Sequence, residues 1–122
     1  SPIPAPAAAL YLARLLIKTN PADAVANARR AAATFPTSTP AHHVLMAALI
    51  ADGSHRQAAE IGRKLIEIDP ANPITTQLLA DATSKAEKKQ WTQETARLLS
   101  DDPKAREAFQ HDLAWVRGEL VH

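Results

Sequence analysis

The chain repeats its own pattern of prolines and apolar residues about every 34 positions. Laid against itself at a shift of 34, the chain matches Pro6 with Pro40, Tyr11 with Leu45, Ala24 with Ala58, and Pro36 with Pro70. A shift of 33 carries the second unit onto a third, matching Pro40 with Pro73, Leu45 with Leu78, Leu65 with Leu98, and Pro70 with Pro103. Self-similarity at this period is typical of arrays in which each unit is one pair of helices that buries its apolar face against the next pair.

Proline also marks where the helices begin. Four prolines follow a residue that can cap a helix, in the pairs Asn20-Pro21, Thr39-Pro40, Asn72-Pro73 and Asp102-Pro103. Such a side chain accepts a hydrogen bond from the first helical turn, and proline suits the first helical position because its missing N–H is not needed there. Ser54 and Gln57 form a capping-box pattern that predicts another start. The predicted helices span residues 6–18, 21–34, 40–51, 55–68, 73–86, 88–100 and 103–121.

Apolar spacing supports an all-α fold. The last predicted helix carries its apolar residues at steps of three or four, at Ala105, Phe109, Leu113, Val116 and Leu120. No segment shows the sustained alternation of a strand, and no Asn-Gly or Asp-Gly turn joins two β-branched runs. The X-Pro pairs of residues 1–5 disfavour helix and predict a linker or disordered N-terminus. Residues 6–122 are predicted to form a single helical domain, which agrees with the usual size of a domain.

The middle unit carries Leu45, Gly53, Ala58 and Pro70, and the first unit carries Tyr11, Ala24 and Pro36. At this repeat length, these residues resemble the tetratricopeptide repeat family. The resemblance implies a right-handed superhelical solenoid of about seven helices in antiparallel pairs, with units at about 6–36, 40–70 and 73–103 and a capping helix at 103–121. It also implies a concave face, lined by the first helix of each unit, that holds a peptide or a partner helix.

The sequence departs from the family pattern at several positions. The usual Trp and Gly-Tyr pair of the first helix is missing, and Gly62 stands where a large aromatic side chain normally fills the second helix. In the third unit, Trp91 replaces the small residue found at Ala24 and Ala58. Because a Trp does not allow the same close approach of two helices, the last pair is expected to be splayed or rotated.

The resemblance also places the residues of a partner-binding groove. They are Ala9, Ala13, Leu16, Ile17, His43, Ala47, Ile50, Ala51, Thr76, Ala80 and Thr83. Family members that grip a C-terminal carboxylate use a clamp of Lys, Arg and Asn on this face, and that clamp is absent here. A small apolar lining suits an apolar helix or extended segment of a partner protein. The alternative is that these residues pack between helices. Trp91 and Trp115 are possible interface anchors.

Composition excludes several other classes of function. The formal charge of +1 is far from the strongly basic balance of a nucleic-acid binder, and the chain has no cysteine. The five histidines lack the spacing of metal ligands, and no Gly-rich phosphate loop or nucleophile motif occurs. We therefore expect no enzyme activity, cofactor or metal, and no apolar run is long enough to insert into a membrane.

The partner and the compartment are left open by the sequence. A protein-interaction scaffold is the leading hypothesis, and a structural domain that forms a homodimer or braces another domain of a larger protein is the alternative. The absence of cysteine does not decide between a cytoplasmic and a periplasmic location for a soluble chain, since proteins of both compartments tolerate it, and the compartment stays unknown. The high usage of Ala, Arg and Pro is typical of a GC-rich bacterial gene.

Overall fold

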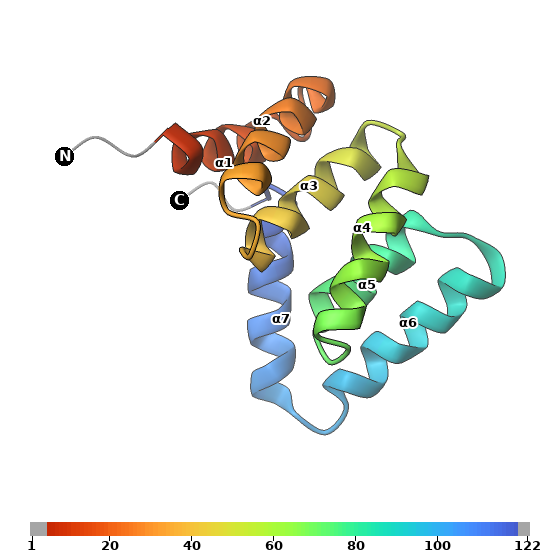
Figure 1. The fold of residues 1–122 in the computed structure, drawn as a ribbon. Coiled ribbons are helices and arrows are strands. Elements are labelled where there is room, and N and C mark those ends of the chain that lie inside the picture. The colour runs from red at the N-terminus through yellow and green to blue at the C-terminus, as the bar shows by residue number, and fades with distance from the viewer. Residues whose placement is uncertain (1–4, 120–122) are drawn as a thin grey trace.

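The computed structural model describes residues 5–119, with side chains from Ala7 onward, and this part of the chain forms seven helices and no strand (Figure 1). The helices are α1 (Ala5–Leu16), α2 (Pro21–Thr34), α3 (Thr39–Ala51), α4 (His55–Ile68), α5 (Pro73–Ala82), α6 (Lys85–Leu99) and α7 (Pro103–Val116). The predicted all-α class is confirmed for these residues. The predicted linker falls outside them except for Ala5, which opens α1. The prediction that the last helix runs to residue 121 is wrong, because α7 ends at Val116 and Gly118 beyond it adopts a positive φ of 71°.

Three of the predicted caps are confirmed. The side chains of Asn20, Asn72 and Asp102 each accept a backbone N–H from the first turn of α2, α5 and α7, respectively. The predicted cap of α3 is wrong by one residue, because Ser38 rather than Thr39 holds this position and its hydroxyl accepts the N–H of the third residue along. These caps are local chemistry between neighbouring residues, and the predicted helix starts therefore lie within two residues of the observed ones for α1 to α5 and for α7.

The predicted capping box at the start of α4 does not form. The helix begins after Ser54, but the Ser54 hydroxyl makes no capping hydrogen bond. Gln57 is turned outward instead, and its Oε1 accepts a hydrogen bond of 2.6 Å from Arg29 Nη2 of α2.

The third helix pair turns earlier than predicted. Helix α5 ends at Ala82 rather than at residue 86, and α6 begins at Lys85, which adopts a positive φ of 55°. Lys88 Nζ donates to the carbonyl oxygen of Ala80 at 2.9 Å, and this oxygen also accepts the backbone N–H of Thr83 at the end of α5. Lys85, Lys88 and Lys89 therefore lie in the first turns of α6.

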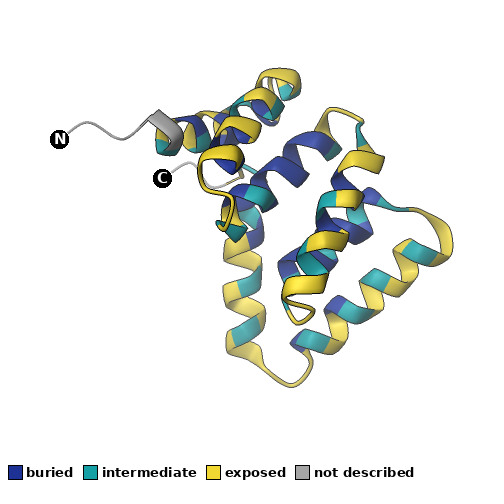
Figure 2. Cartoon of the chain, in the orientation of Figure 1, coloured by how far each residue is buried: buried dark blue, intermediate teal, exposed yellow. Residues whose placement is uncertain are grey.

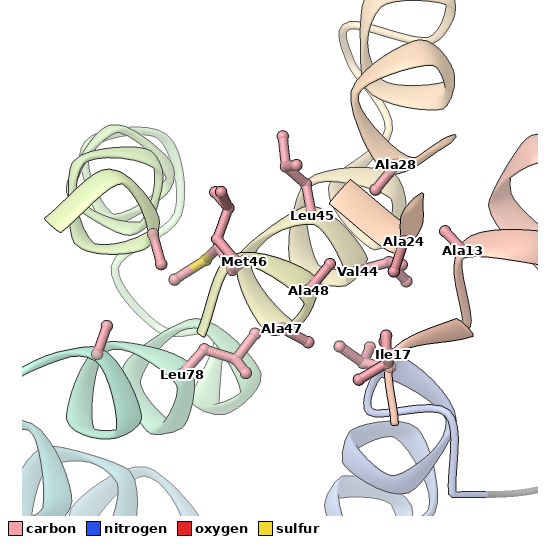
Figure 3. Packing of buried hydrophobic residues seen from close by; sticks show 14 of the residues in the cluster. Ala13, Ile17, Ala24, Ala28, Val44, Leu45, Met46, Ala47, Ala48 and Leu78 are labelled. Carbon is pink, nitrogen blue, oxygen red and sulfur yellow. The ribbon is translucent and has the colours of Figure 1, made fainter. Parts of the chain in front are cut away.

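Each helix from α1 to α6 packs on the next one along the chain, and α3 also contacts both α1 and α5. Figure 2 shows α3 as the most deeply buried helix, and Val44 to Leu49 are all buried within it. Figure 3 shows Ala13 of α1 and Ala24 of α2 converging on α3, where small side chains allow the helix backbones to approach closely.

Gly62 explains how α4 approaches its neighbours without the large aromatic side chain that the resemblance implies. A Cβ atom at this position would lie 2.7 Å from Met46 Cε and 2.6 Å from Leu79 Cδ2. Both of those side chains are fully buried. Met46 and Leu79 therefore fill the space from α3 and α5, and a side chain at residue 62 would overpack this part of the core.

Arginines at the repeat period link successive second helices. Arg29 of α2 bonds to α4, and Arg63 of α4 forms a 2.5 Å ion pair with Glu87 of α6. The Arg63 guanidinium holds the pKa of Glu87 below its ordinary value through this bond. Arg97, the equivalent residue of α6, pairs with Glu94 of its own helix. These exposed contacts add little to stability.

Helix α7 departs from the place of a simple end cap. It contacts α3 and α5 as well as the preceding α6, and its last turn reaches α1. Figure 1 shows α7 standing apart from α6 and running back toward the first half of the chain. In the part of the chain that the structure describes, no helix combines the length and the apolar character needed to cross a membrane.

Candidate partner-binding cleft

The predicted groove residues lie mostly inside the domain. Those that are buried are Ala9, Ala13, Ile17, His43, Ala47, Thr76 and Ala80. Leu16, Ile50 and Thr83 are partly buried, and Ala51 is exposed. Most of this face is therefore closed to a partner in the structure, which agrees with the alternative that the residues pack between helices.

Helix α7 covers part of this face. Its Leu113 and Val116 are buried and belong to the same apolar cluster as Ile17 of α1 and Ala47 of α3. Helices α1, α3 and α5 thus all contact α7 of the same chain.

Arg14 fixes the last turn of α7 to α1. Its Nε donates to the carbonyl oxygen of Trp115 at 2.7 Å, and its guanidinium carbon lies 4.1 Å from the centroid of the Trp115 ring. A guanidinium over an indole face gains a cation–π attraction. Burial lowers the pKa of Arg14 from its ordinary value, yet an arginine stays charged at neutral pH. Arg117 adds an ion pair with Asp81 of α5. The end of α7 is therefore bonded to both α1 and α5.

Gly118 allows α7 to approach α1 this closely. It has a positive φ of 71° and ends the helix in a Schellman motif, in which the N–H of Glu119 bonds to the carbonyl of Ala114 at 2.8 Å. A Cβ atom at residue 118 would overlap the carbonyl oxygen of Arg14. Both the backbone conformation and the space therefore require glycine here.

Beside this turn, a small pocket lies among several of the predicted groove residues. It has a volume of about 190 Å³ and is lined by Ile17, Lys18, Ala47, Ile50, Ala51, Leu78, Asp81, Arg117 and Glu119. This volume is below the range of ligand-binding clefts, so we do not place a partner segment there.

A larger cleft of about 910 Å³ lies on the other side of α7. Its walls are the start of α3, the α4–α5 connection with the start of α5, the end of α6, and one face of α7. Its larger apolar residues are Pro40, Pro73, Ile74, Leu98, Leu99, Phe109, Trp115 and Val116. The first half of α7 forms a free-standing wall, because most of its residues up to Asp112 are exposed (Figure 2).

Buried hydroxyl and imidazole groups support the floor of the cleft. His43 is 4% exposed, and its Nε2 shares a 2.7 Å hydrogen bond with Thr75 Oγ1. Burial lowers the pKa of His43 to about 4, with a smaller contribution from the neighbouring His42, so the ring is neutral at pH 7. Thr76 Oγ1 and Thr95 Oγ1, which do not line the cleft, lie 2.6 Å apart and link α5 to α6.

The two predicted anchor residues lie in different surroundings. Trp91 is partly buried on α6, where its indole N–H points to Glu87 Oε1 at 3.5 Å, and α5 and α6 stay in contact around it. Trp115 lines the cleft and stacks on Arg14. Sequence reasoning did not place Phe109 at the site, although it stood on the apolar stripe of the last predicted helix. The apolar spacing of this helix did not show that the first half of the stripe faces an open cleft.

No group of three or more His, Asp or Glu side chains in the described part of the chain is close enough to hold a metal ion. Comparison of the sequence with models of known protein families found no match, and searches of curated proteins and of solved structures gave none either. The function therefore has to be argued from the cleft itself.

Proposed function

We propose that the chain is a protein-interaction module that binds a helical apolar segment of another protein in the cleft beside α7. The observation that carries the proposal is this cleft of about 910 Å³, which has apolar side chains on each of its walls and is open to solvent. Its volume corresponds to about two turns of α-helix. A segment of that size would pack between α7 and the ends of α3, α5 and α6 as a further helix of the domain.

The free-standing half of α7 supports this proposal. Phe109 lines the cleft from one side, and Leu98 of α6 lines it from another. Both are only partly buried, so each would lose further apolar surface to water when a segment enters. Large apolar side chains around a concave site are the usual anchors of a protein interface.

We also propose that the six helices α1 to α6 form a short solenoid of the tetratricopeptide type. The contacts of α3 with α1 and α5, and the Arg29 and Arg63 bonds between second helices, support regular stacking. In this arrangement α7 covers one end of the concave face, which holds a peptide or partner helix in the tetratricopeptide family. The partner of this chain then binds beside α7.

A matched pair of variants tests the site. The probe is a capped 14-residue peptide of Leu, Ala and Gln, with Leu at helical spacing, followed by fluorescence anisotropy with the full chain. Phe109→Ser is expected to weaken binding about tenfold or more, because interface aromatic anchors contribute roughly 1–4 kcal/mol. Phe35→Ser removes an equally large side chain that is 42% exposed and lies outside the cleft, and it should leave binding unchanged. Equal affinities for the two variants would show that the peptide does not use the cleft.

A second candidate function, self-association, rests on an apolar row on the outside of α1. Tyr11, Leu12 and Leu15 are 52%, 45% and 64% exposed, although large apolar side chains are usually buried. If this row joins two copies, the double variant Leu12→Lys/Leu15→Glu abolishes a dimer that sedimentation equilibrium detects in the wild-type chain. A wild-type chain that stays monomeric over a hundredfold concentration range rules this function out.

A further inference from the structure

The charged side chains that line the cleft are all acidic. Asp69 lies at the end of α4 on one wall, and Asp112 lies on α7 on the opposite wall. No Lys or Arg side chain is among the described residues that line this cleft. Two histidines also line the cleft: His43, which adds no positive charge at neutral pH because burial lowers its pKa to about 4, and the exposed His111, which lies 3.4 Å from Asp112.

Both carboxylates are accessible to an incoming group. One oxygen of Asp69 accepts the backbone N–H of Ala71 at 3.1 Å, and the residue as a whole is exposed. The Asp112 side chain is 66% exposed and lies 3.4 Å from His111 of the same helix. Arg106 is the nearest basic residue before Asp112 on α7. It donates to the carbonyl oxygen of Leu99 and does not line the cleft.

The helix starts at the cleft offer little to an anion. Helices α3 and α5 both begin there, and helix N-termini ordinarily attract negative groups through their free N–H donors. Here Pro40 and Pro73 carry no N–H. The side chains of Ser38 and Asn72 already accept from the first turns of α3 and α5. The two full negative charges therefore dominate the electrostatics of the cleft.

We infer that the partner segment is a cationic amphipathic helix, with an apolar stripe toward Phe109 and Leu98 and with Lys or Arg residues on both flanks that face Asp69 and Asp112. This inference rests on the proposed function of the cleft and names the chemistry of its occupant. Charges on opposite walls select a helix with basic residues on both sides of its apolar stripe, and they repel an acidic one.

Three peptides of one design separate the inference from the proposed function. The neutral Leu/Ala/Gln peptide is compared with twins in which the flanking Gln residues are all Lys or all Glu. With the full chain at low ionic strength, the Lys peptide is expected to bind about tenfold tighter than the Glu peptide, since two exposed ion pairs are each exchanged for a repulsion. The neutral peptide should lie between them.

The source of the preference is tested on the protein. Asp69→Asn/Asp112→Asn should bring the ratio of the two affinities to within about threefold, and Asn at residue 69 can still accept the N–H of Ala71. The matched control, Asp52→Asn/Glu60→Gln, removes two exposed acidic residues that do not line the cleft. It changes the net charge equally and should keep the tenfold ratio.

The outcomes distinguish the two claims. If all three peptides bind equally and Phe109→Ser weakens them all, the proposed function stands and the inference is overturned. Tighter binding of the Glu peptide, or an equal loss of preference in both double variants, also overturns it. If the chain dimerises and Phe109→Ser abolishes the dimer, a second copy is the occupant and the inference fails. If none of the peptides binds, the proposed function fails and takes the inference with it.

Discussion

Replacing Gly118 by alanine is expected to destabilise the domain by about 3 kcal/mol and to release the last turn of α7 from α1. Two physical effects add at this position. A residue with a Cβ atom in the left-handed region costs roughly 1–2 kcal/mol, and overlap with the Arg14 carbonyl costs roughly 1–3 kcal/mol more. Urea unfolding followed by circular dichroism measures the loss, and amide hydrogen exchange in α7 shows whether the turn is released.

Gly53 supplies the control for this variant. It also ends a helix in a Schellman motif, with a positive φ of 81°, but a Cβ atom there meets nothing within 4 Å. Gly53→Ala should therefore cost only about 1–2 kcal/mol from the backbone conformation. The difference between the two variants measures the contact between α7 and α1. Equal losses would mean that α7 does not approach Arg14 as closely as the structure shows.

The stability of the domain is expected to fall steeply between pH 6.5 and pH 4 because of His43. The folded state holds the pKa of this ring at about 4, against an ordinary value of 6.5. Between these values the unfolded chain binds a proton that the folded chain does not, so the contribution is complete above pH 6.5 and is lost as the pH falls toward 4. At about 1.4 kcal/mol for each pKa unit, the loss is about 3 kcal/mol.

His43→Gln removes the titration and keeps a polar group near Thr75, so this variant should show a flatter curve of unfolding free energy against pH. The control variant His55→Gln replaces an exposed histidine and keeps His43, so it should reproduce the wild-type curve. Carboxylates contribute to the slope in all three proteins, and only the difference between curves belongs to His43. Superimposable curves for wild type and His43→Gln would show that this ring is not buried as a neutral group.

Much of the fold could be predicted because its signals are local. Asn20, Asn72 and Asp102 cap their helices through bonds to residues two or three positions away, and such bonds are readable from the sequence alone. The end of α5 could not be read in this way. Lys88 bonds there to the Ala80 carbonyl eight residues back across the turn, and no local pattern in the sequence signals such a contact. Helical periodicity runs through this turn without a break, and the prediction therefore extended α5 by four residues.

The site was less predictable, because it depends on where α7 docks. Arg14 and Trp115 are 101 positions apart, and no local pattern links them. The repeat register carried the family groove onto α1, α3 and α5, and it placed Ile17 and Ala47 together, as the structure does. It gave no sign that Val116 of α7 would cover this region. The open cleft is a consequence of that docking and of the half of α7 that stands free.

The binding site of a neutral amphipathic helix on the chain can be mapped directly. Nuclear magnetic resonance spectra of the ¹⁵N-labelled full chain, titrated with the Leu/Ala/Gln peptide, would locate the binding surface residue by residue. We expect the amide signals of Ile74, Leu98 and Phe109 and the indole signal of Trp115 to shift, while those of Phe35 stay in place. Shifts confined to the outer row of α1 at Tyr11 and Leu15, or no shifts at high peptide excess, would contradict a partner-binding cleft beside α7.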